Sequence, residues 1–457
     1  MMQGKASEMA AMQTIPTGYK KTEVGVIPED WDILSLGEIF TFKNGINKSK
    51  DFFGFGSPIV NYMDVYSSSC IDGECINGLV SVSELEKKNY SAVKNDVFFT
   101  RTSETVNEVG LSSVLFGHVR DTVFSGFLLR ARQRKNFFVG DYMKFCFREK
   151  SIRSQIQGTA SYTTRALTNG TLLSKVLIPV PAKQEQFIIA KVLSDIDALI
   201  AALEQLIAKK QSIKTATMQQ LLTGRARLPQ FAQRPDGTTK GYKTSELGQI
   251  PEDWKVLPLG ELCHFENGDR SSNYPSSDEF VSFGIPFINA GHIDNGVIDS
   301  KGMDYISAVI YARLGGGKVK PGDLVYCLRG SLGKFGVVPD DFGMGAIASS
   351  LVIVRPITSR TSCEFISEYF KSNISKRMVS LWAGGAAQPN LGAKELANFL
   401  VPLPNNLEQT AIATILSDMD SELNALEQKL AKARDLKQGM MQQLLTGRIR
   451  LPLEVGA

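Results

Sequence analysis

The sequence contains two copies of one frame, and this duplication constrains the fold more than any other feature. Ile-Pro-Glu-Asp-Trp at positions 27–31 returns at 250–254, and Met-Gln-Gln-Leu-Leu-Thr-Gly-Arg at 218–225 returns at 441–448. Both motifs recur after 223 positions. A period of that length is domain-sized, whereas stacked solenoid repeats are about 20–45 residues long. We therefore expect two similarly framed domains in this chain.

Between the shared ends, the two halves differ almost completely. Residues 50–172 look little like residues 272–395. Each of these inserts mixes short β-like runs with glycine turns and short amphipathic stretches. The candidate strands are 96–99, 283–289, 323–328 and 351–354, and the candidate short helices are 152–157 and 363–371. The sequence therefore predicts two mixed α/β inserts.

A long helix is predicted after each insert. Following Pro-x-Pro motifs at 179–181 and 402–404, apolar residues recur at the three-four spacing of a coiled-coil seam. The pattern predicts helices over 183–222 and 407–445, each ending at a glycine and an arginine. The first predicted seam is Ile189, Val192, Ile196, Leu199, Leu203, Leu206 and Ile213, interrupted by Lys210. The second is Leu416, Met419, Leu423, Leu426, Leu430, Ala433, Met440 and Leu444.

A helix of 40 residues is about 60 Å long and cannot bury its apolar stripe against a small domain. We expect the two long helices to pair with each other as an intramolecular coiled coil. An antiparallel pair would relate the inserts by a pseudo-two-fold axis and place them at its opposite ends. The alternative is an ordinary amphipathic helix pair inside one core.

The expected fold class is α+β, with two mixed α/β domains separated by two long helices that form an antiparallel coiled coil. The linker between the halves is rich in Pro, Gly, Gln and Thr. The expected boundaries are a disordered N-terminal extension (1–16), a first domain (17–180), long helix 1 (181–224), a linker (225–239), a second domain (240–403), long helix 2 (404–447) and a C-terminal tail (448–457).

Composition excludes several classes of protein. With 43% apolar and 21% charged residues, the chain resembles a globular protein. No apolar run approaches the roughly 20 residues needed to span a bilayer, and no secretory signal is recognised, so we expect a cytoplasmic location and no membrane partner. The six cysteines are scattered, and only Cys70 and Cys75 are close in sequence. No metal site is therefore expected.

The sequence shows none of several common catalytic motifs. It has no Asn-Pro pair, which the base-holding loop of an amino methyltransferase requires. Gly54 and Gly56 are out of register for a cofactor turn, and the glycines at 315–317 lack the Ser or Thr of a phosphate-binding loop. We therefore expect no enzymatic activity and no cofactor in this chain.

Positive charge is concentrated in part of each insert, although the net charge is only +4. Residues 101–175 hold twelve Lys or Arg against five Asp or Glu, and residues 313–377 hold ten against five. Such focused charge is typical of a surface that binds phosphates. It indicates a nucleic-acid partner.

The shared frame resembles the specificity subunits of Type I restriction-modification systems. The resemblance is carried by Gly-Tyr-Lys, Ile-Pro-Glu-Asp-Trp and Leu-Gly-Glu at the start of each copy, and by Pro-x-Pro, Glu-Gln and Gln-Gln-Leu-Leu-Thr-Gly-Arg at its end. The second insert adds stretches at 321–324, 329–333 and 388–391 that look like motifs of target-recognition domains. The resemblance covers residues 17–452, with a looser match at 95–103.

The resemblance implies a DNA-reading subunit that catalyses nothing. Each insert would be a target-recognition domain for one half of a split, asymmetric site in double-stranded DNA, with half-sites about one helical turn apart. The paired helices would fix the gap. Two modification subunits would bring S-adenosylmethionine and methylation, and two restriction subunits would bring ATP, Mg²⁺, translocation and cleavage.

The candidate DNA contacts follow from loop position and residue type. Sequence readers hydrogen-bond base edges with polar side chains and hold phosphates with cationic ones. In the first insert the candidates are Arg101, Ser103, Tyr162 and Arg165. In the second they are Arg329, Ser331 and Gln388, with Arg270 and Asn289 ranked lower. Each can instead be an ordinary surface or turn residue.

Two other functions are compatible with parts of the pattern. One is a fused restriction-methylation enzyme with its own catalytic domain, which the missing methyltransferase motifs disfavour. The other is a coiled-coil adaptor with two protein-binding heads and no affinity for DNA. Salt-dependent DNA binding distinguishes a DNA reader from an adaptor.

Overall fold

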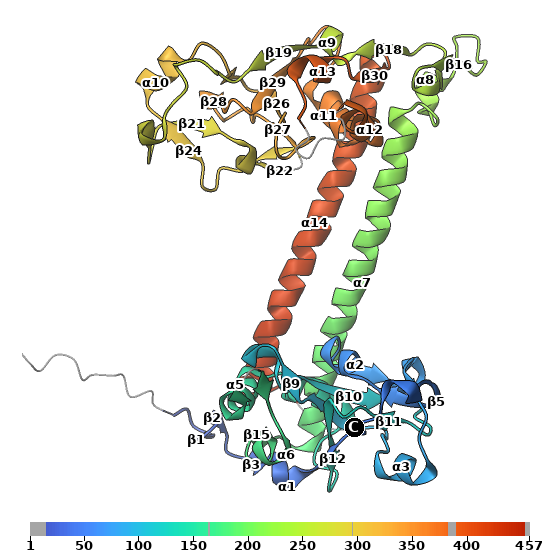
Figure 1. Cartoon of the computed structure of the whole chain (residues 1–457), viewed down its shortest axis with the longest axis vertical. Coiled ribbons are helices and arrows are strands. Elements are labelled where there is room, and N and C mark those ends of the chain that lie inside the picture. Colours follow the sequence, from blue (N-terminus) through green and yellow to red (C-terminus); the bar gives the residue numbers. More distant parts are fainter. Residues whose placement is uncertain (1–14, 163–164, 295, 383–389, 453–457) are drawn as a thin grey trace, which may run out of the picture. The chain divides into compact units, whose positions relative to one another are not determined.

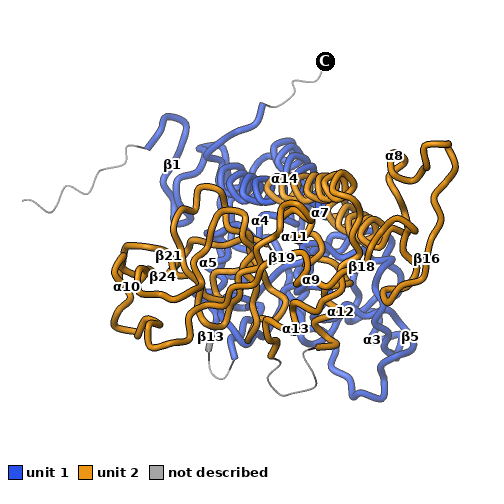
Figure 2. The backbone as a smooth tube through the Cα atoms, turned by 90° about the horizontal axis from the view of Figure 1, so that it is seen from above, with its two compact units in different colours: residues 1–204, 429–457 blue, residues 205–428 orange. Residues whose placement is uncertain are grey.

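The computed structural model describes residues 15–162, 165–294, 296–382 and 390–452. The chain divides into two compact units, shown in Figure 2: unit 1 is residues 1–204 with 429–457, and unit 2 is residues 205–428. Each unit holds one insert and part of each long helix. Most of the expected N-terminal extension lies outside the described residues. Within the described ranges, no helix has both the length and the apolarity of a membrane span.

Unit 1 is built on a mixed five-stranded sheet in the order β4-β12-β8-β10-β6. The central strand β8 is buried along its whole length, which explains its unbroken Val-Phe-Phe-Thr run. The strands are β4 (Phe40–Asn44), β12 (Leu128–Gln133), β8 (Val97–Thr100), β10 (Ser112–Phe116) and β6 (Cys70–Asp72). Helices α4 (Gly140–Cys146) and α5 (Lys150–Thr159) complete the core, and α5 confirms the helix predicted at 152–157.

Smaller elements of unit 1 surround the end of β8. The strand β9 (Thr102–Ser103) follows β8 after one residue and joins a small sheet in the order β13-β14-β9. The other members of that sheet are β13 (Ser161–Tyr162) and β14 (Ala166–Leu167). The short helix α2 (Tyr62–Tyr66) contacts both β8 and β10. This arrangement brings residues from three distant stretches of the insert together.

Unit 2 has an antiparallel sheet in the order β19-β29-β26-β27 and a second, five-stranded sheet in the order β20-β24-β21-β28-β25. The first sheet consists of β19 (Cys263–Asn267), β29 (Leu351–Pro356), β26 (Leu324–Cys327) and β27 (Phe335–Val337). Its strands β26 and β29 confirm the predictions at 323–328 and 351–354, and β21 (Ile285–Ile288) confirms that at 283–289. Helix α11 (Cys363–Lys371) has the predicted bounds and is followed by α12 (Asn373–Trp382).

The shared motifs fold into the same elements in both units. The hairpin of β1 (Tyr19–Thr22) and β2 (Gly25–Pro28) matches that of β16 (Tyr242–Ser245) and β17 (Gly248–Pro251). Each unit also repeats one ion pair beside its main sheet, in which two guanidinium nitrogens of a half-buried arginine bind both oxygens of a buried aspartate. Arg132 binds Asp96 at 2.6–2.7 Å, and Arg355 binds Asp323 at 2.7 Å.

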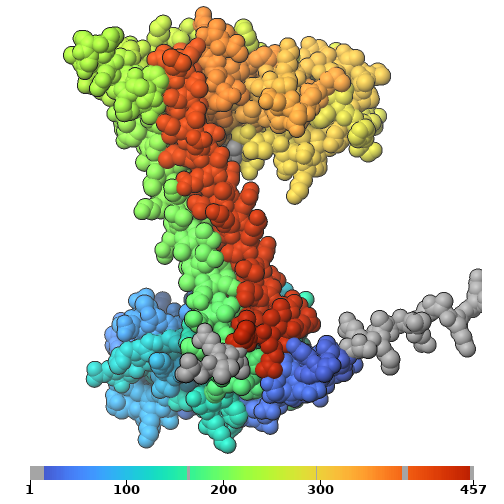
Figure 3. Space-filling model, turned by 180° about the vertical axis from the view of Figure 1, so that it is seen from behind, coloured from blue at the N-terminus to red at the C-terminus, as the bar shows by residue number. Residues whose placement is uncertain are grey.

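The two long helices are α7 (Lys183–Leu222) and α14 (Asn406–Leu444), and they pack side by side (Figures 1 and 3). In unit 1, Asp197 near the start of α7 binds Lys437 near the end of α14 at 2.5 Å. In unit 2, Lys210, which is later in α7, binds Glu422, which is earlier in α14, at 2.7 Å. These contacts confirm an antiparallel pair with the predicted helix bounds to within one residue.

The seam of α14 is as predicted. In α7, every second predicted seam position is wrong by one residue. Leu199, Leu206 and Ile213 are exposed, so these three predicted seam residues lie outside the interface. Lys214, one residue after Ile213, is buried and ion-paired with Asp420. A lysine can fill a seam position because its apolar stem packs while its ammonium group reaches an acid on the partner helix. The apolar stripe alone does not reveal such an acid.

The expected linker contains a short helix and binds both the start of α14 and the second Ile-Pro-Glu-Asp-Trp motif. The short helix is α8 (Pro229–Ala232). Just before α8, Arg227 binds Glu408 at 2.6 Å and Asp253 at 2.7 Å. Trp254 donates from Nε1 to the same Glu408 oxygen at 3.1 Å. We call this arrangement of arginine, tryptophan and two acids the Arg-Trp clamp. In unit 1 it is formed by Arg450, Trp31, Glu185 and Asp30.

The glycine that ends each long helix is required by its backbone conformation and its neighbours. Gly224 has φ +68° and Gly447 has φ +67°, both in the left-handed region that favours glycine. A Cβ at Gly224 would lie 2.4 Å from a ring carbon of Pro251. The proline of the Ile-Pro-Glu-Asp-Trp motif therefore packs against the helix end, which links the two ends of the duplicated frame.

Candidate nucleic-acid interface

The same backbone geometry holds the loop after the central strand in each unit. The carbonyl of Arg101 accepts from Thr168 N at 2.9 Å, and the carbonyl of Leu328 accepts from Leu391 N at 3.0 Å. Arg101 therefore corresponds to Leu328, and the next residue, Thr102, corresponds to Arg329. We call the loop at 101–111 the first reading loop and that at 328–334 the second reading loop. Both carry candidate DNA contacts.

Three of the four candidates in unit 1 have described side chains. Arg101 donates to the carbonyl of Gly126 at 3.0 Å, so it holds the backbone beside the exposed Phe127. Ser103 is buried and donates to Glu108 at 3.0 Å. Arg165 is exposed, with only a loose 3.9 Å contact to Glu104. Tyr162 lies in β13, but its side chain is outside the described part of the structure.

A pocket of about 430 Å³ in unit 1 joins two of these candidates to residues that sequence reasoning missed. It lies between α2, the first reading loop and the segment after β13. The side chains of Met63 and Phe127 at its edge are exposed. The lining residues are Tyr62, Met63, Tyr66, Thr102, Ser103, Glu104, Glu108, Phe127 and Arg165.

Glu108 is the most firmly held acid of this pocket. Tyr66 donates to one carboxylate oxygen at 2.7 Å and Ser103 to the other at 3.0 Å. The hydrogen bonds from Tyr66 and Ser103 lower the pKa of Glu108, so its carboxylate is ionised at neutral pH. The aromatic spacing at 62–66 was visible in the sequence, but nothing local links Tyr66 to an acid 42 residues away.

In unit 2 the second reading loop presents a cation. Arg329 is exposed and its backbone pairs with Asn390. Ser331 is half-buried, and Arg270 is exposed with its Nε donating to the carbonyl of Ser349 at 3.2 Å. Gln388 lies outside the described residues.

Asn289 has a local role in the fold of unit 2. Its side-chain oxygen accepts from Gly291 N at 2.8 Å, and its amide donates to Asp304 at 2.7 Å. Both polar groups of the side chain are therefore already engaged within the domain. Its contact with DNA remains a prediction, but the structure does not favour it.

Part of the positive charge counted in the first insert is internal. Arg148 donates to the carbonyls of Ser68 and Ser112, and Arg153 donates to the carbonyls of Gly110 and Asn107. Burial lowers the pKa of Arg153 to about 10, so it is still protonated at neutral pH. These guanidinium groups hold loops together, and a count of charges along the sequence overstates the charge available for phosphate.

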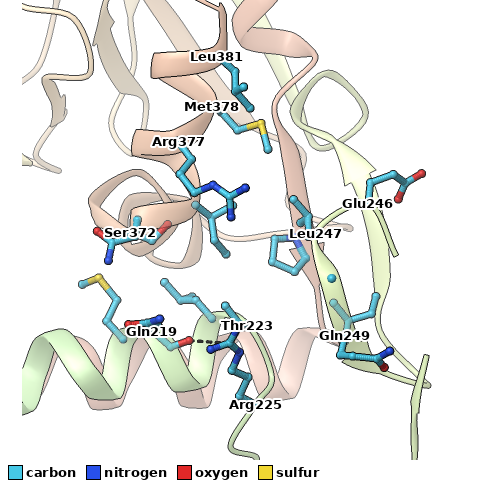
Figure 4. Close-up of a pocket in the computed structure, with 17 residues that line it drawn as sticks. Gln219, Thr223, Arg225, Glu246, Leu247, Gln249, Ser372, Arg377, Met378 and Leu381 are labelled. Carbon is cyan, nitrogen blue, oxygen red and sulfur yellow. Dashed lines mark hydrogen bonds between the residues drawn. The ribbon is translucent and has the colours of Figure 1, made fainter. Parts of the chain in front are cut away.

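Unit 2 also contains a cavity of about 430 Å³ away from the reading loop, shown in Figure 4. It lies between the end of α7, the β16–β17 hairpin and α12, and Leu222, Ile250 and Met378 form part of its apolar wall. Arg225 and Arg377 also line it. None of the candidate DNA contacts with described side chains does. We therefore assign this cavity to the frame and not to the reading surface.

Two relatives match along much of this chain. The type I restriction enzyme MjaVIII specificity subunit of Methanocaldococcus jannaschii is 23% identical over 442 residues, covering 93% of this chain and 94% of the relative. The EcoBI specificity subunit of Escherichia coli is 26% identical over 304 residues, covering 64% of this chain and 62% of the relative. The fold is similar to that in the crystal structure of a Type I restriction-modification S subunit from M. genitalium, with a TM-score of 0.52 and 16% sequence identity. The similarity covers 91% of this chain and 96% of the M. genitalium chain.

The family model that matches is the Type I restriction modification DNA specificity domain, at residues 28–214 and again at 251–433. Its two matches coincide with the two copies of the frame and together cover most of the sequence. Each match contains one insert, one reading loop and most of one long helix. The chain therefore belongs to the Type I restriction-modification DNA specificity family, as the non-catalytic specificity subunit of such a system.

Proposed function

We propose that this subunit reads a split, asymmetric DNA site, with unit 1 reading one half and unit 2 the other. The observation that carries the proposal is that two unlike reading loops occupy the same place on a duplicated frame. One loop combines Glu108 with an aromatic pocket, and the other exposes Arg329. Similar frames with different loops suit two different half-sites, because base edges are distinguished by donor and acceptor pattern.

The same proposal includes the partners that the family resemblance implies. Two modification subunits would supply S-adenosylmethionine and methyl transfer, and two restriction subunits would supply ATP- and Mg²⁺-dependent translocation and cleavage. The target-recognition domains would correspond to residues 17–180 and 240–403, and the paired helices α7 and α14 would connect them. Because the proposed partner is DNA inside the cell, we propose a cytoplasmic location for the complex.

Methylation sequencing tests this function directly. Cells that express the chain with its modification subunits should methylate one motif of two short half-sites separated by a fixed number of unspecified bases. Arg329→Ala should change base preference in one half only. A continuous motif, or a change in both halves, would contradict the division of labour between the units.

Affinity measurements separate this function from a protein adaptor. The assembled complex should bind its site with an affinity that falls steeply between about 50 and 200 mM salt, because cationic contacts release counterions from phosphates. A complex with no affinity for DNA at low salt would favour the adaptor.

A heptad insertion tests whether the helices set the gap. Seven residues added to α7 near Gln205 and to α14 near Gln428 preserve the seam and lengthen each helix by about 10 Å. The gap between half-sites should grow by about three base pairs. Seven residues added to the β16–β17 hairpin are the matched control and should leave the gap unchanged.

A further inference from the structure

Glu108 places a fixed negative charge in the reading loop of a protein whose partner is a polyanion. A carboxylate near the DNA backbone is repelled by phosphates, and this repulsion weakens binding. In the major groove, however, a carboxylate has a favourable partner, which is the exocyclic amino group of cytosine (N4) or adenine (N6). An acid built into a reading surface therefore indicates a contact with a base and not with phosphate.

The hydrogen bonds that hold Glu108 leave acceptor capacity for such a contact. An ionised carboxylate has about four acceptor positions. Tyr66 occupies one on Oε1 and Ser103 occupies one on Oε2. The Thr105 side chain also hydrogen-bonds this carboxylate, so about one acceptor position is left for a donor from outside. Because Tyr66 and Ser103 already fix the side chain, little conformational entropy is lost when a base binds.

The surroundings of Glu108 suit the edge of a base pair. The rings of Tyr62 and Tyr66 are stacked, with centroids 5.8 Å apart and an interplanar angle of 20°. Met63 and Phe127 are about 60% exposed, a high value for large apolar side chains beside a pocket. Such clusters mark binding surfaces. Arg165 lines the same pocket, and because its side chain is exposed and only a 3.9 Å contact joins it to Glu104, its guanidinium group can also reach a phosphate.

The second reading loop, residues 328–334, contains no acidic residue. In unit 1, Phe99 of β8 pairs with Ser112 of β10, and twelve residues separate the two across the first reading loop. In unit 2 the equivalent pair, Tyr326 and Phe335, is separated by eight residues. The four additional residues of unit 1 are in the stretch that carries Glu108. The acid is thus a feature of one reading loop and not of the shared frame.

We infer that Glu108 is a specificity-determining residue of unit 1, where it accepts a hydrogen bond from the exocyclic amino group of one base in its half-site. This inference rests on the proposed function, in which unit 1 reads one half of a split site. It predicts that the two half-sites are read with opposite chemistry at this loop, an acceptor in unit 1 and the donor Arg329 in unit 2.

The first experiment compares the methylation motifs of the wild type and Glu108→Gln. A glutamine keeps the shape of the side chain but donates as well as accepts, so it tolerates bases that the carboxylate rejects. Discrimination at one base pair should fall about tenfold, in the half-site that Arg329→Ala leaves unchanged. The matched control is Glu84→Gln, which removes the same charge from an exposed helix of unit 1 and should leave all base preferences unchanged.

The second experiment begins with the wild-type complex, so its main result does not depend on whether a variant folds. Binding of the wild-type complex is measured on DNA in which single amino groups of the unit 1 half-site are removed, with purine replacing adenine or pyrimidin-2-one replacing cytosine. One replacement should weaken binding about tenfold, and which replacement does so identifies the base. For Tyr66→Phe, which frees one side of Glu108, that loss should be smaller.

These outcomes separate the inference from the function on which it rests. Unaltered preferences in Glu108→Gln, or no loss from any amino-group removal in that half-site, would overturn the role of Glu108 while the split motif stands. A wild type that methylates no split motif would overturn the proposed function itself. A purely structural role for Glu108 predicts instead that Glu108→Gln lowers the unfolding temperature and affinity for every sequence equally.

Discussion

The two copies of the Arg-Trp clamp differ in burial, and this difference predicts unequal effects of the same substitution. Arg227 has 5% of its side chain exposed and binds Glu408, which has 1% exposed. Arg450 has 37% exposed and binds Glu185, which has 3% exposed. We predict that Arg227→Ala destabilises unit 2 more than Arg450→Ala destabilises unit 1.

The magnitude follows from how strongly solvent screens each arginine's ion pairs. Without Arg227, the carboxylate of Glu408 stays buried with Trp254 as its remaining clamp donor, and losing one partner of a buried pair costs about 3–5 kcal/mol. Arg450 is more than one third exposed, so solvent screens its ion pairs and we expect about 2 kcal/mol. For units of this size, 1 kcal/mol corresponds to about 2–4 °C in Tm, so unit 2 should lose roughly 10 °C and unit 1 roughly 5 °C.

The assay is calorimetric unfolding of the full chain, with hydrogen exchange followed by mass spectrometry to assign each transition to a unit. A rescue variant tests the electrostatic origin of the loss. Glu408→Gln in the Arg227→Ala background removes the unpaired charge and keeps an acceptor for Trp254 Nε1, so at least half of the stability should return. Equal losses for the two arginine variants, or no recovery of stability in the double variant, would refute the reasoning.

Three further predictions concern the helices. Lys214→Met should leave the free energy of unfolding unchanged or raise it by about 1 kcal/mol, because an apolar side chain then fills the seam and Asp420 keeps its ion pair with Lys371 at 3.0 Å. Asp420→Ala leaves Lys214 buried without its acid and should lower the free energy of unfolding by about 2–3 kcal/mol. Urea titration measures both variants, and a larger loss for Lys214→Met than for Asp420→Ala would contradict this prediction. Burial raises the pKa of Asp420, but the hydrogen bonds from Lys214 and Lys371 lower it more, so the net folded-state pKa is below 3.8. The stability that Asp420 contributes is thus present above about pH 4 and lost as the pH falls below it; the Tm difference between wild type and Asp420→Asn should shrink from about pH 6 to about pH 3. Finally, Gly224→Ala should lower the free energy of unfolding by about 2 kcal/mol or more, because φ is +68° and the new Cβ would meet Pro251. Gly439→Ala, in the interior of α14 where the added Cβ has open space, should raise it by about 0.5–1 kcal/mol. Thermal unfolding of the two variants measures both changes.

Much of the candidate interface could be anticipated, because loop position and residue type are local properties. Ser103 and Arg165 line one pocket, and Arg329 is exposed on the matching loop of unit 2. The same reasoning also selected Asn289 as a lower-ranked DNA contact, although both polar groups of its side chain are hydrogen-bonded inside the domain. It could not find Glu108, because an acid in a basic segment is recognisable as a base reader only when its fixing partners are known.

The sequence by itself determined the duplicated frame, the bounds of the two long helices and a few inner strands, namely β8, β21, β26 and β29. Periodicity and capping residues act over a few positions, so they can be read directly from the chain. The tertiary structure alone decided which residues meet across long separations. It replaced Ile213 by Lys214 in the seam, joined Arg227 to Glu408 across 181 residues, and directed Arg148 and Arg153 to backbone carbonyls. A charged side chain gains stability from whichever partner the fold brings near it, and that partner is not encoded in its own neighbourhood.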